Sequence, residues 1–155
     1  MRYWLIKSEP GDYSIDDLER DGTEHWDGVR NAQARNLMRD EMSVGDPVLF
    51  YHSSANPPGV VGLAEVASGP YSDHTQFDPT SKYHDPTSDP GAPRWVMVDM
   101  RFVEKLPRKV GLPELRTYPQ LADMVLLKRS RLSVQPVRAD EFRFIVALAR
   151  TDAPT

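Results

Sequence analysis

Residues 48–66 read VLFYHSSANPPGVVGLAEV, and this stretch decides the fold. Two runs rich in β-branched and aromatic residues, 48–52 and 60–66, flank a loop that contains two prolines and a glycine. Apolar runs bounded by turn residues are typical of β-strands. Strands that follow one another along the chain usually pair. The stretch therefore predicts two neighbouring antiparallel strands.

Further strands are expected on either side of this pair. Residues 2–7 are aromatic and β-branched, and residues 132–137 form a last short apolar run. Residues 95–103 alternate, with Val98 and Met100 on one face of the strand and Asp99 on the other. The chain thus has about five to six strands.

Helical signals lie between and after the strands. Ser14 with Asp17 predicts a capping box for a helix over 15–20. Residues 30–41 carry apolar residues at helical spacing, and residues 139–141 open a final helix. Short helical turns are expected at 113–118 and 120–125. No strand–helix–strand rhythm dominates, so we expect an α/β (α+β) fold with a mixed or antiparallel sheet, curled into a barrel.

Residues 67–93 are the least regular part of the chain. They contain five prolines and repeat the tetrapeptide Asp-Pro-Thr-Ser at 78–81 and 85–88. A long loop inside a compact domain is usually functional or mobile.

The composition is that of one globular domain. Of the 155 residues, 39% are hydrophobic and 27% are charged, which predicts a single domain over 1–150 and a disordered tail over 151–155. The chain has no cysteine, which excludes disulfides, thiolate catalysis and cysteine-ligated zinc. The apolar stretch before Lys7 is too short for a signal peptide or a membrane span, so we expect a cytoplasmic protein without a membrane partner.

Charge is distributed unevenly along an acidic protein. The net charge is −4, but residues 1–100 carry 8 basic and 17 acidic side chains, whereas residues 101–155 carry 11 basic and 6 acidic ones. The basic last third could serve a polyanion-binding face, but charge alone favours an ordinary solvated surface.

Most familiar catalytic motifs are absent from the sequence. It has no glycine-rich phosphate loop and no Gly-x-Ser-x-Gly turn. A metal site from His52, His74 and His84 with an aspartate is conceivable, but none of these residues stands at a familiar ligand spacing. We therefore expect no cofactor, no metal and no catalytic residue.

Four polar segments stand near the ends of expected elements, at 7–10, 26–31, 50–53 and 131–134. Trp26 and Tyr51 offer flat faces for stacking. Hydrogen-bonding groups that suit the edge of a planar ligand are Ser8, Glu9, Asn31, His52 and Ser133. Cations that suit phosphate are Lys7, Arg30 and Arg131. Stacking, edge contacts and cations together are how an unstacked base is held.

Each of these residues also has a purely structural interpretation. Trp26 alone is more often a core residue, Asp27-Gly28 is first a turn, and Arg30 and Asn31 suit the start of a helix. His52 alone is more often a hydrogen-bonded structural histidine. Only the combination of segments points to a binding site.

The same segments resemble a known family. The motifs WLIKSEP at 4–10, WDGVRN at 26–31, FYHS at 50–53 and RLSV at 131–134 are similar to those of the EVE domain, over about residues 2–148. Many short bacterial proteins belong to that family. The resemblance implies a PUA-like curled β-barrel with flanking helices and a pocket for a modified base, usually modified cytosine in DNA. The ligand-binding residues it carries over are Lys7, Ser8, Glu9, Trp26, Val29, Arg30, Asn31, Tyr51, His52, Ser53, Arg131 and Ser133.

Three functions follow as hypotheses. The favoured one is non-enzymatic recognition of a modified nucleobase, with DNA rather than RNA, or a modified nucleoside, as the partner. The second is an enzyme acting on nucleic acid or a nucleotide-like molecule, with Glu9 or His52 as general base. The third is a small-metabolite binder that uses the same pocket. The sequence leaves the oligomeric state open.

Overall fold

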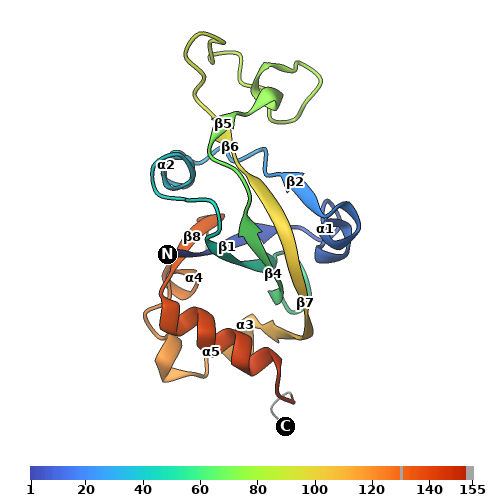
Figure 1. Ribbon diagram of the computed structural model, residues 1–155, viewed down its shortest axis with the longest axis vertical. Helices are drawn as coiled ribbons and strands as arrows, with labels where there is room; N and C mark the ends of the chain where they lie inside the picture. The colour runs from blue at the N-terminus through green and yellow to red at the C-terminus, as the bar shows by residue number, and fades with distance from the viewer. Residues whose placement is uncertain (130, 153–155) are drawn as a thin grey trace.

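The protein is built around one mixed, six-stranded sheet, curled into a half-barrel (Figure 1). The computed structural model describes residues 1–129 and 131–152. In spatial order the strands are β2 (Thr23–His25), β7 (Asp99–Gly111), β4 (Gly59–Val66), β3 (Pro47–His52), β1 (Tyr3–Ser8) and β8 (Val134–Val137). Only β1 and β3 pair in parallel; the other neighbours are antiparallel.

The stretch at 48–66 forms the predicted antiparallel pair, β3 with β4. Because side chains alternate along β3, Phe50 packs into one hydrophobic cluster and Leu49 into another on the opposite face. Register shifts in the pairing of β4 with β7 mark bulges, which increase local twist and help the sheet to curl.

Three helices begin near the predicted positions. The capping box of Ser14 and Asp17 is present at the start of α1 (Ile15–Asp21). α2 (Ala32–Asp40) begins two residues later than predicted, because the side chain of Asn31 caps it by accepting from the Ala34 N–H. α5 (Ala139–Ala149) has acidic residues in its first turn, as expected.

Short helical turns complete one end of the molecule. They are α3 (Leu112–Leu115), η2 (Pro119–Leu121) and α4 (Val125–Lys128). Figure 1 shows α3, α4 and α5 gathered at the end of the sheet away from β5 and β6. Their apolar residues pack into the cluster that contains Leu5 and Leu49. No helix among the described residues is long and apolar enough to cross a bilayer.

The strand predicted over 95–103 is wrong in its extent. Val96–Met97 form β6, which pairs with β5 (Tyr71–Ser72), and a separate strand, β7, continues to Gly111. In the second half of β7 only Leu106, Val110 and Gly111 are buried, and Pro107 interrupts the pattern. The alternation that indicates a strand is therefore weak there. The strand predicted from 132 likewise begins at Val134.

The irregular segment projects at the end opposite α5 and is held by local hydrogen bonds (Figure 1). Beyond β5 it contains a short 3-10 helix, η1 (His74–Phe77). Both copies of the repeated tetrapeptide make the same turn, in which Asp78 and Asp85 accept hydrogen bonds from the N–H and Oγ1 of the threonine two residues later. The disordered tail predicted at 151–155 falls partly on residues 153–155, outside the described residues.

A buried carboxylate ties the first strand to the turn before β3. Asp46 accepts hydrogen bonds from the Trp4 indole N–H at 3.0 Å and from the Ser43 N–H at 2.9 Å.

Asp46→Ala should lower the free energy of unfolding by about 1–3 kcal/mol, because buried donors lose their partner. Urea denaturation measures the change. Asp40→Ala, which removes an exposed carboxylate paired with Arg39, should leave the midpoint unchanged; equal midpoints for both variants would contradict this role for Asp46.

Candidate nucleic-acid interface

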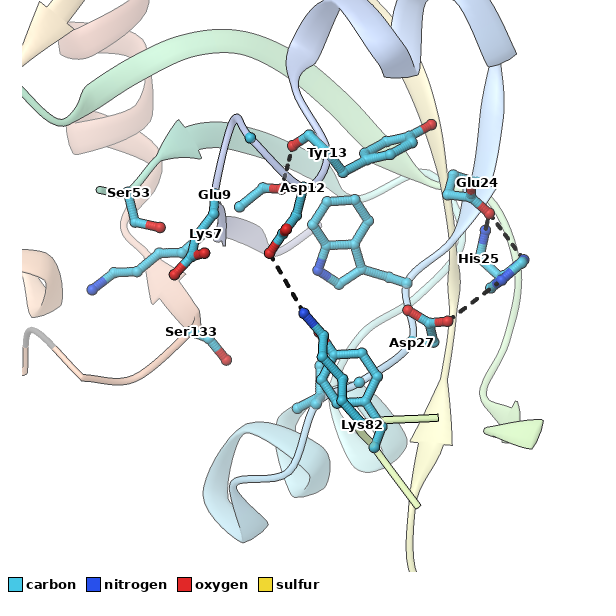
Figure 2. Close-up of a pocket in the computed structure, with 16 residues that line it drawn as sticks. Lys7, Glu9, Asp12, Tyr13, Glu24, His25, Asp27, Ser53, Lys82 and Ser133 are labelled. Carbon is cyan, nitrogen blue, oxygen red and sulfur yellow. Dashed lines mark hydrogen bonds and ion pairs between the residues drawn. The ribbon is translucent and has the colours of Figure 1, made fainter. Parts of the chain in front are cut away.

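A cleft of about 710 Å³ opens where the end of β1 meets the segment between β2 and α2 (Figure 2). This volume lies in the range of ligand pockets. Seven predicted site residues line it: Lys7, Ser8, Glu9, Trp26, Val29, Ser53 and Ser133. The other lining residues are Gly11, Asp12, Tyr13, Glu24, His25, Asp27, Gly28, Lys82 and Tyr83.

The cleft has two polar sides. In Figure 2, Lys7, Glu9, Ser53 and Ser133 lie on one side, and the group around Asp27 lies on the other. Four carboxylates line the cleft, against two lysines, one of which forms an ion pair with Asp12 at 3.6 Å. A surface rich in acceptors suits a neutral ligand that offers N–H donors.

The aromatic wall is Trp26, which is held edge-on by two other rings. Its centroid lies 6.0 Å from that of Tyr13 and 5.6 Å from that of Phe50, with interplanar angles of 77° and 79°. The backbone N–H of Trp26 donates to Val98 O at 2.8 Å. Trp26 is half-buried: it packs against the core and also lines the cleft, so its position is compatible with both roles that the sequence left as alternatives.

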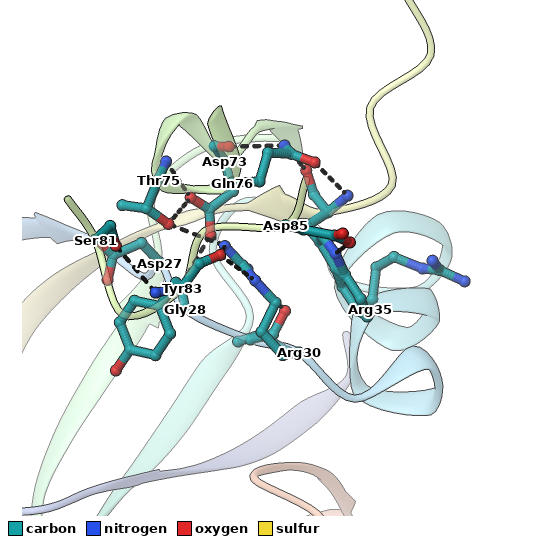
Figure 3. A network of polar contacts seen from close by, with 12 residues as sticks. Asp27, Gly28, Arg30, Arg35, Asp73, Thr75, Gln76, Ser81, Tyr83 and Asp85 are labelled. Carbon is teal, nitrogen blue, oxygen red and sulfur yellow. Dashed lines mark hydrogen bonds and ion pairs between the residues drawn. The ribbon is translucent and has the colours of Figure 1, made fainter. Parts of the chain in front are cut away.

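Asp73 fastens the irregular loop to the cleft. Its side chain is fully buried and accepts hydrogen bonds from Gly28 N–H at 2.8 Å, from Arg30 Nη1 at 3.0 Å, and from the N–H and Oγ1 of Thr75 (Figure 3). Burial alone would raise the pKa of Asp73, but the hydrogen bonds from Thr75, Gly28 and Arg30 outweigh it and lower the pKa. A charged carboxylate therefore holds residues 28–30 against the loop.

Arg30 has a different role from the predicted phosphate contact. Its five N–H donors make five hydrogen bonds to four acceptor atoms of the protein: Asp73 Oδ2, Thr75 Oγ1, the Val29 carbonyl oxygen, and the Tyr83 carbonyl oxygen, which accepts two. The guanidinium has no donor left for a phosphate in this arrangement. Arg30 instead positions Tyr83, a cleft residue that sequence reasoning had left out of the site.

Gly28 is required for this packing. Its φ is +76°, in the region that favours glycine, and a Cβ there would lie 2.5 Å from Cζ of Tyr83. The Tyr83 ring therefore lies directly over the Gly28 backbone. The Asp27-Gly28 pair is the turn that the sequence suggests, and it also admits an aromatic side chain from 55 residues along the chain.

Two predicted site residues lie elsewhere. Tyr51 is 3% exposed and packs with Leu5 and Leu49, so its predicted stacking role is wrong; strand alternation directs it away from Phe50 and the cleft. His52 Nε2 accepts a hydrogen bond from Ile15 N–H at 3.1 Å, at the start of α1. Burial, followed by the charge of Lys109, lowers the pKa of His52. The neutral ring thus has a structural contact, which the sequence also allowed.

The remaining two, Asn31 and Arg131, line a separate shallow groove of about 280 Å³. The groove is also lined by Gln33, Lys128, Arg129 and Leu132. We call it the basic groove. Two short segments connect the basic groove with the cleft. In the segment 29–31, Val29 lines the cleft and Asn31 lines the groove; in the segment 131–133, Ser133 lines the cleft and Arg131 lines the groove.

Comparison with known proteins agrees with this architecture. The family model of the EVE domain matches residues 2–148. Thymocyte nuclear protein 1 of mouse is 43% identical over 97% of this chain and 74% of its own length. A hypothetical protein from Leishmania major is 49% identical, with a TM-score of 0.93 over 97% of this chain and 95% of that one.

A further solved structure is that of human THYN1 in complex with DNA that contains 5-methylcytosine. It is 39% identical, with a TM-score of 0.94 over 99% of this chain and 100% of that one. Both the sequence match and the fold extend over nearly the whole chain. The chain belongs to the EVE domain family, with its PUA-like fold.

Proposed function

We propose that this protein is a non-enzymatic reader of a modified cytosine in DNA. The base enters the cleft, and the DNA backbone lies along the basic groove. The observation that carries the proposal is that the two adjoin: a cleft with an aromatic wall and carboxylate acceptors lies two residues along the chain, on two segments, from a groove with three cations. The 5-methylcytosine DNA bound by human THYN1 supports cytosine as the base.

The chemistry of cytosine suits the cleft. Cytosine presents an exocyclic amine, and carboxylates accept hydrogen bonds from it. Glu9 is exposed in the cleft and therefore available as an acceptor. The indole of Trp26 and the ring of Tyr83 supply stacking surface, which contributes about 1–3 kcal/mol per base.

An enzyme remains the second candidate, with Glu9 as general base. His52 is less suited to that role, because its Nε2 is already an acceptor for Ile15 N–H. A reader and an enzyme differ in what the loss of the Glu9 charge does, and this difference can be measured.

Glu9→Gln separates reader from enzyme. In a reader, the new amide presents a donor to the amine of the base, so affinity for an oligonucleotide with one 5-methylcytosine should fall about tenfold or more. Fluorescence anisotropy gives the affinity, and Glu19→Gln on the exposed face of α1 is the matched control. Mass spectrometry of the oligonucleotide after long incubation should show no product. Turnover by the wild type that Glu9→Gln abolishes, with binding retained, would establish the enzyme instead.

Gly28→Ala should damage the cleft. The new methyl group would displace the Tyr83 ring, and alanine is strained at a φ of +76°. We expect at least tenfold weaker binding of the methylated oligonucleotide, by anisotropy. Gly11 lines the same cleft, but a Cβ there would have no atom within 4 Å, so the Gly11→Ala variant should bind like the wild type. Equal affinities of the two folded variants would exclude Tyr83 from the binding wall.

Reversing charge in the basic groove should weaken binding without changing base preference. Lys128→Glu with Arg129→Glu should lower affinity for methylated and unmethylated oligonucleotides alike, because phosphate contacts carry no base information. The slope of log K against log salt should flatten by about 0.7–0.9 for each lost contact. Arg116→Glu with Arg143→Glu makes the same charge change outside the groove and should have a much smaller effect. Changed base preference with an unchanged slope would contradict this assignment.

A further inference from the structure

Three side chains with metal-binding atoms meet at the edge of the cleft. They are His25 at the end of β2, Asp27 two residues later, and His74 in η1. One ligand atom from each lies within 4.8 Å of the other two. The rings of the two histidines are 5.2 Å apart between centroids, and His25 Nε2 lies 3.6 Å from Asp27 Oδ2. The two histidines are 49 residues apart, so sequence spacing gives no sign of the group.

A further carboxylate prepares His25 for this role. His25 Nδ1 lies 2.9 Å from Glu24 Oε1, so a proton on Nδ1 is held there and Nε2 is left with its lone pair (Figure 2). Metal-binding histidines in proteins commonly donate their other N–H to a carboxylate in this way. In Figure 2, the His25 ring lies between the Glu24 and Asp27 side chains.

The charge at the site also favours a cation. The Asp27 side chain is one-third exposed, and the fully buried Asp73 lies nearby. The donors of Arg30 are directed to Asp73 and its neighbours, not to Asp27.

We propose that His25, Asp27 and His74 bind one divalent transition-metal ion, with Zn²⁺ as the expected occupant. Two imidazole nitrogens and one carboxylate oxygen form a common ligand set for Zn²⁺ at metal–ligand distances of about 2.0–2.2 Å. Ligand atoms up to 4.8 Å apart must approach one another by up to about 1.5 Å for tetrahedral coordination. His74, which is exposed, lies on a short 3-10 helix in the loop. Three protein ligands leave a fourth position for water or an anionic oxygen.

At this location, a bound ion would hold the irregular loop against the segment 25–27. Two ligands come from the segment at 25–27 and the third from the loop segment that Asp73 fastens. An ion would therefore join the same two parts of the chain as Asp73 does. This inference does not depend on the proposed function, because it concerns the ion alone.

The test is calorimetric titration of ZnCl₂ into untagged, chelator-washed protein. We expect one ion per chain. Glu24→Gln removes only the hydrogen-bonding partner of a ligand, so it should weaken Zn²⁺ binding about tenfold to hundredfold. His74→Ala and His25→Ala each remove a ligand, so each should weaken binding by more than that. His84→Ala, an exposed histidine of the same loop, is the matched control and should bind like the wild type.

Circular dichroism establishes that each variant is folded, and His74→Ala decides the outcome if His25→Ala is not. No Zn²⁺ binding by the wild type would overturn the proposal. Wild-type affinity in folded His74→Ala, or an equal loss in His84→Ala, would overturn it as well.

Discussion

The cleft depends on one buried carboxylate. Asp73 accepts four hydrogen bonds, two from Thr75 in its own turn and two from residues 28–30 on the other side of the cleft edge. Those contacts keep Arg30 in a geometry in which two of its other donors bind the Tyr83 carbonyl oxygen. Breaking a buried ion pair by removing one partner typically costs about 3–5 kcal/mol, because a charge is left without compensation. The long loop is therefore a fixed wall of the cleft, although it has little regular secondary structure.

Under the proposed function, the cleft and the basic groove have separate tasks. The cleft presents carboxylates and an aromatic wall, whereas the basic groove presents Lys128, Arg129 and Arg131. In nucleic-acid recognition, phosphate contacts supply affinity and base contacts supply discrimination. An acidic protein can use both, because its basic residues are concentrated in the last third of the chain and part of them gather beside the cleft.

Local sequence patterns predicted most of the fold, and they failed where packing decides the outcome. The β3–β4 pair, the capping box of α1 and the acidic first turn of α5 follow from short-range signals, and the structure confirms them. The second half of β7 was missed because its alternation is weak. Seven of the predicted site residues line the cleft, but the direction of Tyr51 and the partners of Arg30 depend on contacts made by residues far along the chain. Tyr83, Lys82 and the His25–Asp27–His74 group lie in or against the irregular loop, where the sequence indicated function without indicating which residues meet.

The most direct measurement of the central claim is a crystal structure of this protein with a DNA duplex that contains a single 5-methylcytosine. The account predicts that the methylated base leaves the stack and occupies the cleft against Trp26 and Tyr83, with its amine toward a carboxylate. It also predicts that the flanking phosphates lie along Lys128, Arg129 and Arg131. A methylated base that stays paired within the duplex, with the cleft open to solvent, would contradict the account.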